Sequence, residues 1–494
     1  MKNVLVFGIL LVGSHWSTET WANTLPKKFI IKYKNSEKIV RLSHDPREIQ
    51  KSTSGLISSS SVASDDVEYV EEDIVLNRFT IPGQDFGSRD TYYYSQWALG
   101  NSGAAIRAPQ AWDITTGSSS VVVAIIDSGI TAHSDISSKI VPGYDFISDA
   151  DMARDGGGRD SDPTDTGDYI SSTDPCYKGY YESSSWHGTH VAGIVAANTA
   201  NGKGVAGVSW GSRIQPVRVL GRCGGYTSDI ADAIRWASGG SVSGVPTNST
   251  PAKVINLSLG GQGTCPQYLQ SAINDARSRG SVVVVAAGNS SLNLDSNDVT
   301  PANCNGVIRV ASSDNQGSLS SFSNFGSNVD IMAPGENIYS LMNSGSSVAA
   351  NESYTSYSGT SMAAPIVSGV VALMMSVNDS LYPNQYKSIL KEIANQSYSC
   401  YGKDCGAGIV DAYEAVLLAQ DTVADSSVGD DTTVVRSPLS SEAEVVTKSS
   451  GGGFCGSVAY SDSDNFPWSF VVLSFVAIFI TLSRRKLGRV QSGQ

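Results

Sequence analysis

Four short runs of apolar, mostly β-branched residues constrain the fold of this 494-residue chain more than any other feature. They span residues 121–126, 254–259, 282–287 and 307–311. Continuous apolar runs of this length are typical of strands that are buried on both faces of a parallel sheet. Helical patterns separate the runs: residues 229–238 follow a Thr-Ser pair, and residues 266–279 begin with proline and stop at a glycine. The alternation predicts an α/β fold with a mostly parallel central sheet.

Differences in composition divide the chain into five segments, which are residues 1–22, 23–90, 91–418, 419–450 and 451–494. The first has a lysine at position 2, a short apolar core and a small-residue cleavage site at residues 20–22, which indicates a secretory signal. The second alternates charged and apolar residues and predicts a small α+β unit. The third carries the parallel-sheet pattern, and the fourth reads as a linker rich in Asp, Ser, Thr and Val. We therefore expect an exported protein with one large domain.

The last segment has the features of a membrane-associated tail. It combines three glycines at residues 451–453, an apolar run at 466–482 and basic residues at 484–486. As a helix with a rise of about 1.5 Å per residue, this run would be about 25 Å long, which is short but adequate for a transmembrane segment. The basic residues would stay in the cytoplasm and leave the large domain outside. The alternative is a buried helix of the globular body.

Charge and cysteine content limit the partners and the compartment. The formal net charge of −13 argues against nucleic acid as a partner, because phosphate binding needs a basic surface. Eight aspartates lie between residues 149 and 174, which indicates either a solvated surface or a cation site. Seven cysteines suit an oxidising compartment. Cys455 lies in the tail, and the other six allow fifteen pairings, none of which the sequence selects. These six are residues 176, 223, 265, 304, 400 and 405.

Three polar residues at the ends of predicted elements form a candidate catalytic set. Asp127 ends a buried strand, His187 opens a helix, and Ser361 opens a long apolar helix. Serine becomes a nucleophile when a histidine removes its proton, and a fixed carboxylate stabilises the imidazolium that forms. A helix N-terminus at Ser361 also favours the negative charge that develops in acyl transfer. Each motif alone is common as a turn, a cap or a metal-ligand pair, but together they predict a serine hydrolase.

The order of these residues along the chain separates the classes of serine hydrolase. The order Asp, His, Ser is that of the subtilisin-type triad. Residues 207–211 match the Gly-x-Ser-x-Gly motif of α/β-hydrolases, but that fold needs its histidine after the serine, and no histidine follows His190. Ser128 suggests a chymotrypsin-like enzyme, but no histidine of the large domain precedes it. A lipase or esterase of the α/β-hydrolase type therefore fails on chain order.

With these motifs, residues 92–418 resemble the subtilisin-like serine peptidases, the subtilases. The resemblance implies a three-layer fold and an endopeptidase of broad specificity that forms an acyl-enzyme with protein or peptide substrates. It implies that Asn289, in the sequence Ala-Ala-Gly-Asn, donates a hydrogen bond to the oxyanion, and that His190 is structural. We expect a monomer. The resemblance places substrate binding at Ser258, Leu259, Gly260, Gly261, Ala287 and Gly288.

Both ends of the chain resemble processing segments. Residues 23–90 resemble the inhibitory propeptide of subtilases, which implies a zymogen that cleaves itself between about residues 82 and 94. A permanently attached accessory domain is the alternative. The tail resembles the GlyGly-CTERM sorting signal of Gram-negative bacteria, which implies transient membrane contact, removal by an intramembrane protease, and display on the cell surface or release. Its alternative is a permanent membrane anchor.

The resemblance also implies structural calcium. Residues 155–162 resemble an acidic calcium loop of secreted bacterial subtilases, and calcium prefers oxygen ligands on flexible loops. Two residues, Gln96 and Asp135, resemble ligands of the common calcium site of the family. A solvated acidic loop is the alternative for the acidic segment. The predicted ligands are Gln96, Asp135, Asp155, Asp160, Asp162 and Asp168.

A different class of function remains as an alternative. A subtilase fold without activity would serve as a binding protein on the cell surface. The complete set of Asp127, His187, Ser361 and Asn289 favours the peptidase.

Overall fold

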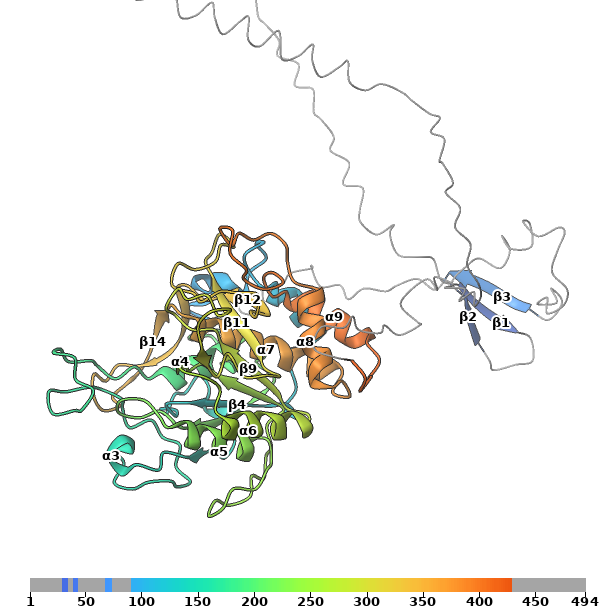
Figure 1. Cartoon of the computed structure of the whole chain (residues 1–494). Coiled ribbons are helices and arrows are strands. Elements are labelled where there is room, and N and C mark those ends of the chain that lie inside the picture. The colour runs from blue at the N-terminus through green and yellow to red at the C-terminus, as the bar shows by residue number, and fades with distance from the viewer. Residues whose placement is uncertain (1–28, 34–38, 43–66, 73–89, 429–494) are drawn as a thin grey trace, which may run out of the picture. The chain divides into compact units, whose positions relative to one another are not determined.

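A computed structural model describes residues 29–33, 39–42, 67–72 and 90–428, and the last of these ranges forms an α/β body (Figure 1). A seven-stranded sheet runs through it in the order β12-β11-β9-β7-β4-β6-β5, with every neighbouring pair parallel. The predicted α/β class is confirmed, and the four apolar runs correspond to β4, β7, β9 and β11. The strands are β4 (Val122–Asp127), β5 (Tyr144–Asp145), β6 (Arg213–Arg218), β7 (Val254–Leu257), β9 (Val282–Ala286), β11 (Ile308–Ser313) and β12 (Ile331–Pro334).

Helices cover both faces of the sheet and make three layers. Alternate residues of β4 belong to two separate apolar clusters: Val123 and Ile125 to one, Ala124 and Ile126 to the other. α5 and α6 pack on the second face, where Figure 1 shows them side by side. The remaining long helices pack on the first face. The helices are α2 (Ala108–Ile114), α3 (Ala150–Ala153), α4 (His187–Ala196), α5 (Thr227–Ala237), α6 (Gln267–Ser278), α7 (Thr360–Val377), α8 (Pro383–Glu392) and α9 (Ala412–Asp421).

α5 shows why these segments are helical and where the predicted bounds differ. Its buried residues Ile230, Ala233, Ile234 and Ala237 recur at the spacing of one helix face. The helix begins at Thr227, two residues before the predicted start, because Tyr226 adopts the extended backbone of the cap position. No side chain caps this end, so the Thr-Ser pair forms the first turn and not the cap.

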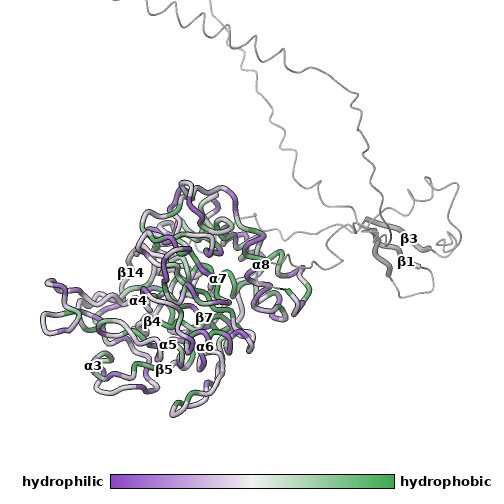
Figure 2. Tube along the Cα trace, viewed as in Figure 1, coloured by the Kyte–Doolittle hydropathy of each residue, from purple (hydrophilic) through white to green (hydrophobic). Residues whose placement is uncertain are grey.

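α7 is the central helix of the body. Figure 2 shows apolar stretches along α7, β4 and β7. In the described part of the chain, α7 is the one helix that is long and apolar enough to cross a membrane, and 83% of its most apolar window is buried inside the body. Its composition is therefore that of a core helix. The apolar run predicted to span a membrane, residues 466–482, lies outside the described residues.

The ordered body continues beyond residue 418, where the predicted linker begins. α9 extends to Asp421, and Val428 is buried. Two amides of α8 hold this end, because Gln385 donates to the carbonyl of Val423 and Asn384 to that of Val428. The described body therefore extends ten residues past the position at which composition predicted the start of a linker.

Smaller sheets complete the described residues. β13 (Ile338–Asn343) pairs with β14 (Glu352–Tyr357), and β8 (Gly261–Gln262) with β10 (Val299–Thr300), both antiparallel. In the predicted α+β unit, β1 (Phe29–Tyr33) pairs antiparallel with β2 (Ile39–Leu42) and β3 (Val67–Glu72). The rest of that unit, the signal and the tail lie outside the described residues.

Three disulfides select one of the fifteen cysteine pairings. They join Cys176 to Cys223, Cys265 to Cys304, and Cys400 to Cys405. The first two close loops of 47 and 39 residues, so each connects segments that are distant in the sequence. Cys455 lies outside the described residues.

Candidate active site

Asp127 and His187 meet at the carboxyl end of the sheet. Asp127 is the last residue of β4 and is fully buried, and His187 is the first residue of α4. The carboxylate atom Oδ1 of Asp127 lies 2.7 Å from Nδ1 of His187 and also accepts the backbone N–H of Ser128. The His187 side chain keeps 22% of its surface exposed. The ring thus has one nitrogen against a buried carboxylate while part of it remains accessible.

A second set of contacts fixes the approach of β4 and α4. The backbone N–H of Gly188 donates to Oγ of Ser128 at 3.0 Å, and this hydroxyl donates to Asp165 at 2.7 Å. A Cβ atom on Gly188 would lie 2.2 Å from the carbonyl oxygen of Gly129. Only glycine lets the start of α4 come this close to the turn after β4. The Asp127–His187 contact is therefore supported by the residues that directly follow each partner.

Ser361 lies in the first turn of α7, against the end of β7. Its hydroxyl donates to the carbonyl of Ser258 at 3.1 Å, and the Ser258 hydroxyl donates to the carbonyl of Ser361 at 2.8 Å. In this structure the Ser361 hydroxyl is thus directed at Ser258. Ser361 and His187 nevertheless line the same cleft, which has a volume of about 740 Å³.

Asn289 points an amide N–H₂ group towards this part of the cleft. Its Oδ1 accepts two hydrogen bonds of 2.8 Å, from the backbone N–H and from the hydroxyl of Thr360. An amide whose oxygen is occupied in this way keeps its nitrogen as the available donor. A Cβ atom on Gly359 would lie 3.2 Å from Nδ2 of Asn289 and 3.6 Å from the backbone N of Ser361. Two N–H donors therefore border the same small space.

Three carboxylates determine the protonation of His187. Burial lowers the pKa of His187, but the charge and hydrogen bond of Asp127, together with the charges of Asp168 and Asp165, raise it above its ordinary value. His190 behaves in the opposite way: burial lowers its pKa to about 3. Its ring stacks on Tyr357 at 4.7 Å between centroids and is fully buried, so His190 is a packing residue.

Most of the predicted substrate-binding residues line the cleft. Ser258, Leu259, Gly260, Gly261 and Gly288 all border it. Ala287 does not: it is fully buried and its carbonyl accepts a hydrogen bond from Asn324, because in β9 and its extension alternate residues face opposite ways. Sequence reasoning missed a second wall of the cleft. The Gly-Gly pair at residues 224–225 was the one sequence feature that could have indicated it. This wall includes Leu220, Cys223, Gly224, Gly225, Thr227, Ile230 and Leu269.

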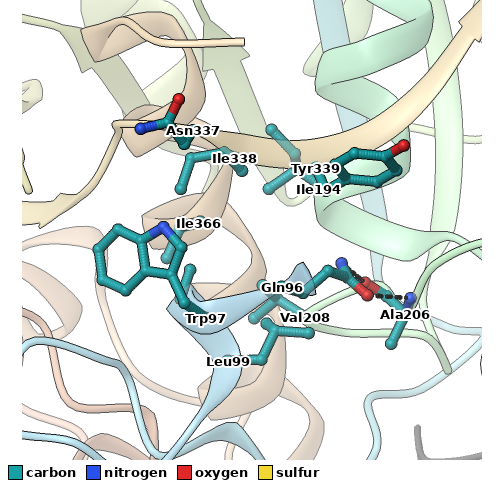
Figure 3. A pocket seen from close by; sticks show the side chains of 11 residues that line it. Gln96, Trp97, Leu99, Ile194, Ala206, Val208, Asn337, Ile338, Tyr339 and Ile366 are labelled. Carbon is teal, nitrogen blue, oxygen red and sulfur yellow. Dashed lines mark hydrogen bonds between the residues drawn. The ribbon is translucent and has the colours of Figure 1, made fainter. Parts of the chain in front are cut away.

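The two residues that resemble ligands of the common calcium site bond to adjacent residues of one loop. Both amide atoms of Gln96 bond to the backbone of Ala206, and Figure 3 shows this pair beside an otherwise mainly apolar pocket. Asp135 accepts hydrogen bonds from Asn201 and from the backbone N–H of Val205, and burial raises its pKa to about 6.

Asp90, which sequence reasoning missed, lies at the same loop as Asp135. Its carboxylate accepts the backbone N–H groups of Ala200, Asn201 and Gly202, and it is almost completely buried. Its negative charge contributes to the raised pKa of Asp135. N–H groups of the loop at residues 200–205 donate to both buried carboxylates, which bring two negative charges to one loop.

The acidic segment does not assemble the predicted ligand set. Asp155 pairs with Arg218 at 2.8 Å, Asp160 accepts the N–H of Asp162, and Asp162 accepts the N–H and hydroxyl of Thr164. Asp168 lines the cleft, where it accepts both the N–H and the hydroxyl of Ser185. Across the described residues, no three His, Cys, Asp or Glu side chains converge as a metal site. Local turns and an arginine occupy these carboxylates instead.

Comparisons with known proteins show the family of this chain. Residues 118–429 match the model of the subtilase family. An extracellular protease of Xanthomonas campestris pv. campestris is 49% identical over 375 residues, which are 76% of this chain and 63% of that protein. An extracellular basic protease of Dichelobacter nodosus is 42% identical over 73% of this chain and 60% of its own length. The matches thus span less than two thirds of these two relatives.

A solved structure supports the fold directly. A protease from Pseudoalteromonas arctica is 50% identical and superposes with a TM-score of 0.65, over 67% of this chain and 99% of that chain. The match therefore includes almost all of that solved chain.

Proposed function

Because the chain belongs to the subtilase family, we propose that it is an exported serine endopeptidase that hydrolyses peptide bonds with Asp127, His187 and Ser361. The contact of 2.7 Å between Asp127 and His187, in the cleft that also holds Ser361, carries this proposal. The relatives named extracellular protease support the exported location and a protein or peptide substrate.

Each of these residues has one role in the proposed reaction. Nδ1 of His187 donates to Asp127, which leaves Nε2 to accept the proton of Ser361 as its oxygen attacks the substrate carbonyl. For this step the Ser361 hydroxyl turns from Ser258 to His187, since catalytic hydrogen bonds often tighten only once substrate is bound. The same imidazolium then protonates the leaving amine, and water hydrolyses the acyl-enzyme.

The oxyanion would form where the two N–H donors converge. Nδ2 of Asn289 and the backbone N–H of Ser361 border the space beside Gly359. Thr360 holds the Asn289 amide before substrate arrives, so little reorganisation is needed as charge develops. The cleft has glycines at 260, 261 and 288, which supports extended peptide substrates and broad specificity.

Labelling Ser361 tests this function. A fluorophosphonate should react with the wild-type protein at Ser361, identified by peptide mass, and the Ser361→Ala variant should remain unlabelled. The variant should also lose about 10⁶-fold in kcat, the size of the loss that is known for subtilisin. A wild-type protein that neither reacts nor cleaves casein would indicate the inert binding protein.

Zymogen processing and tail removal are part of the proposal. In the Ser361→Ala variant, residues 23–90 should stay attached, whereas the wild-type protein should begin between about residues 82 and 94. The intact mass measures both ends at once. A mass that includes residues 451–494 would show that the tail is kept as an anchor.

Structural calcium is the last part of the proposal. Asp90 and Asp135 would hold the ion in place of some of their N–H contacts, and the ion would neutralise two buried carboxylates. It would have no part in the chemical steps, which take place in the cleft.

A further inference from the structure

Arginines of this chain hold the acidic segment, residues 149–174, in place. The carboxylate of Asp174 has 1% of its surface exposed, and it bonds to Nη2 of Arg154 through both oxygens at 2.9 Å and to Nη1 of Arg222 at 2.9 Å. The backbone N–H and the hydroxyl of Ser171 complete its hydrogen bonds. Charge-assisted hydrogen bonds to two guanidinium groups hold this buried carboxylate in a defined position. Removing the carboxylate would leave both arginines without their counter-charge.

This junction is joined directly to the cleft. We define residues 220–225 as the cleft loop, since Leu220, Cys223, Gly224 and Gly225 line the cleft. Arg222 belongs to this loop and is the partner of Asp174 on that side.

Two further bonds connect the cleft loop to the acidic segment or its immediate neighbour. The backbone N–H of Arg222 donates to the carbonyl of Met152 at 3.0 Å, and the disulfide joins Cys223 to Cys176, two residues after Asp174. At Gly221 a Cβ atom would lie 2.2 Å from the Met152 oxygen, so the two segments touch through their backbones. The position of the cleft loop therefore follows that of the acidic segment.

We infer that Asp174 is a positioning residue for peptide substrates, which sets one wall of the cleft through Arg222. This inference rests on the proposed peptidase function. Asp174 bonds directly to Arg222 of the cleft loop. Ser361, His187 and Asn289, by contrast, are held by α7, α4 and the turn after β9. Loss of the carboxylate releases two like-charged arginines and lets the wall move, and this affects substrates long enough to contact the wall.

Substrate length separates this role from general stability. We would compare a small amino-acid ester, which needs only the reacting groups, with a peptide that extends along the cleft loop. Active sites are counted by fluorophosphonate titration, so that only folded enzyme is compared. For Asp174→Asn, kcat/KM for the peptide should fall by about 10-fold or more, mainly through KM, because small misplacements of positioning groups are costly. The ester should be hydrolysed at the wild-type rate per active site.

The matched control is Asp151→Asn, which removes the same charge from an exposed position of the same segment. This control should behave as the wild type with both substrates. If Asp174→Asn changes neither substrate, or slows both equally per active site, the inference is overturned. If the wild type and the control hydrolyse neither substrate, the proposed function itself fails.

A second variant covers the case in which Asp174→Asn does not fold. Replacing Arg222 by glutamine removes the charge that links the cleft loop to Asp174 and leaves Asp174 paired with Arg154. This variant should show the same selective loss with the peptide. An Arg222→Gln variant that hydrolyses both substrates at wild-type rates would show that Asp174 does not set the wall through Arg222.

Discussion

At the scale of single residues, the pKa of His187 can be tested directly, because nearby acidic groups raise it. The charges of Asp127, Asp168 and Asp165 raise the pKa of His187 against the effect of burial. A general base must be neutral, so kcat/KM falls as the pH falls through this pKa. Asp168→Asn removes one of the charges that raise it, and the acid limb of the pH profile should therefore move to lower pH. The pH dependence of kcat/KM for a small ester measures this shift.

The control for this prediction is Asp379→Asn, an exposed position that does not line the cleft. Its acid limb should match that of the wild type. A limb that moves to higher pH in Asp168→Asn, or that moves equally in both variants, would contradict the assignment of His187 as the base.

Asn289 offers a test of transition-state stabilisation at the same scale. Its amide is held by Thr360, and its Nδ2 borders the space beside Ser361. Asn289→Ala should lower kcat by about 10²–10³-fold with little change in KM, because the lost bond acts on the developing charge. Asn328→Ala, at an exposed site, is the control. A rise in KM of this size, with kcat unchanged, would assign Asn289 to substrate binding instead.

Residue types at element ends could be predicted, but side-chain partners could not. Asp127 and His187 were found because a polar residue directly ends a buried strand or opens a helix, and the structure brings them together. Asp155 was predicted as a calcium ligand, yet it pairs with Arg218, which lies 63 residues further along the chain. A contact of this kind depends on the packing of β6 against β5, which no local pattern contains.

At the scale of elements, α7 carries a prediction about close packing. Gly369 lies in the middle of this helix, and a Cβ atom there would be 2.6 Å from Cβ of Val208. Alanine favours a helix interior by about 1 kcal/mol over glycine, but overpacking a core costs about 1–3 kcal/mol. Gly369→Ala should therefore lower the free energy of unfolding. Melting of the Ser361→Ala protein, which cannot digest itself, gives the measurement.

A double variant tests the cause of this loss. Val208→Ala removes Cγ1, which would lie 2.8 Å from the added Cβ, but keeps Cβ of residue 208 at 2.6 Å. Gly369→Ala should therefore cost less, though still something, in that background. The double variant should lose about 0.5–3 kcal/mol less free energy of unfolding than the sum of the two single variants. Additive effects would mean that the helix, and not the contact with Val208, accounts for the loss.

The sequence predicted the central strands well, but it predicted the end of the body less well. Apolar runs identified β4, β7, β9 and β11 because both faces of a parallel sheet are buried. The end of the body was placed too early, since residues 419–428 are polar in composition and are held by α8 through Gln385 and Asn384. Hydrogen bonds from a neighbouring helix fixed a segment that its own composition describes as a linker.

For the whole molecule, a calcium ion at the proposed site would tie the first residues of the body to the rest. Asp90 stands at the start of the described body, Asp135 follows β4, and the loop that both contact connects α4 to β6. Without a cation these are two buried carboxylates that repel each other. An ion bound here would stabilise the folded state by about 2.7 kcal/mol at 100 times its Kd.

The two candidate calcium positions give opposite results with matched substitutions. In the Ser361→Ala protein, saturating calcium should raise Tm relative to EDTA. Asp135→Asn should abolish most of this rise, since the ion loses a buried ligand, whereas Asp160→Asn should retain it because that carboxylate only closes its own turn. If Asp160→Asn abolished the rise and Asp135→Asn kept it, the ion would belong to the acidic segment. Equal melting in calcium and EDTA for the parent protein would show that arginines and hydrogen bonds hold these carboxylates without a bound ion.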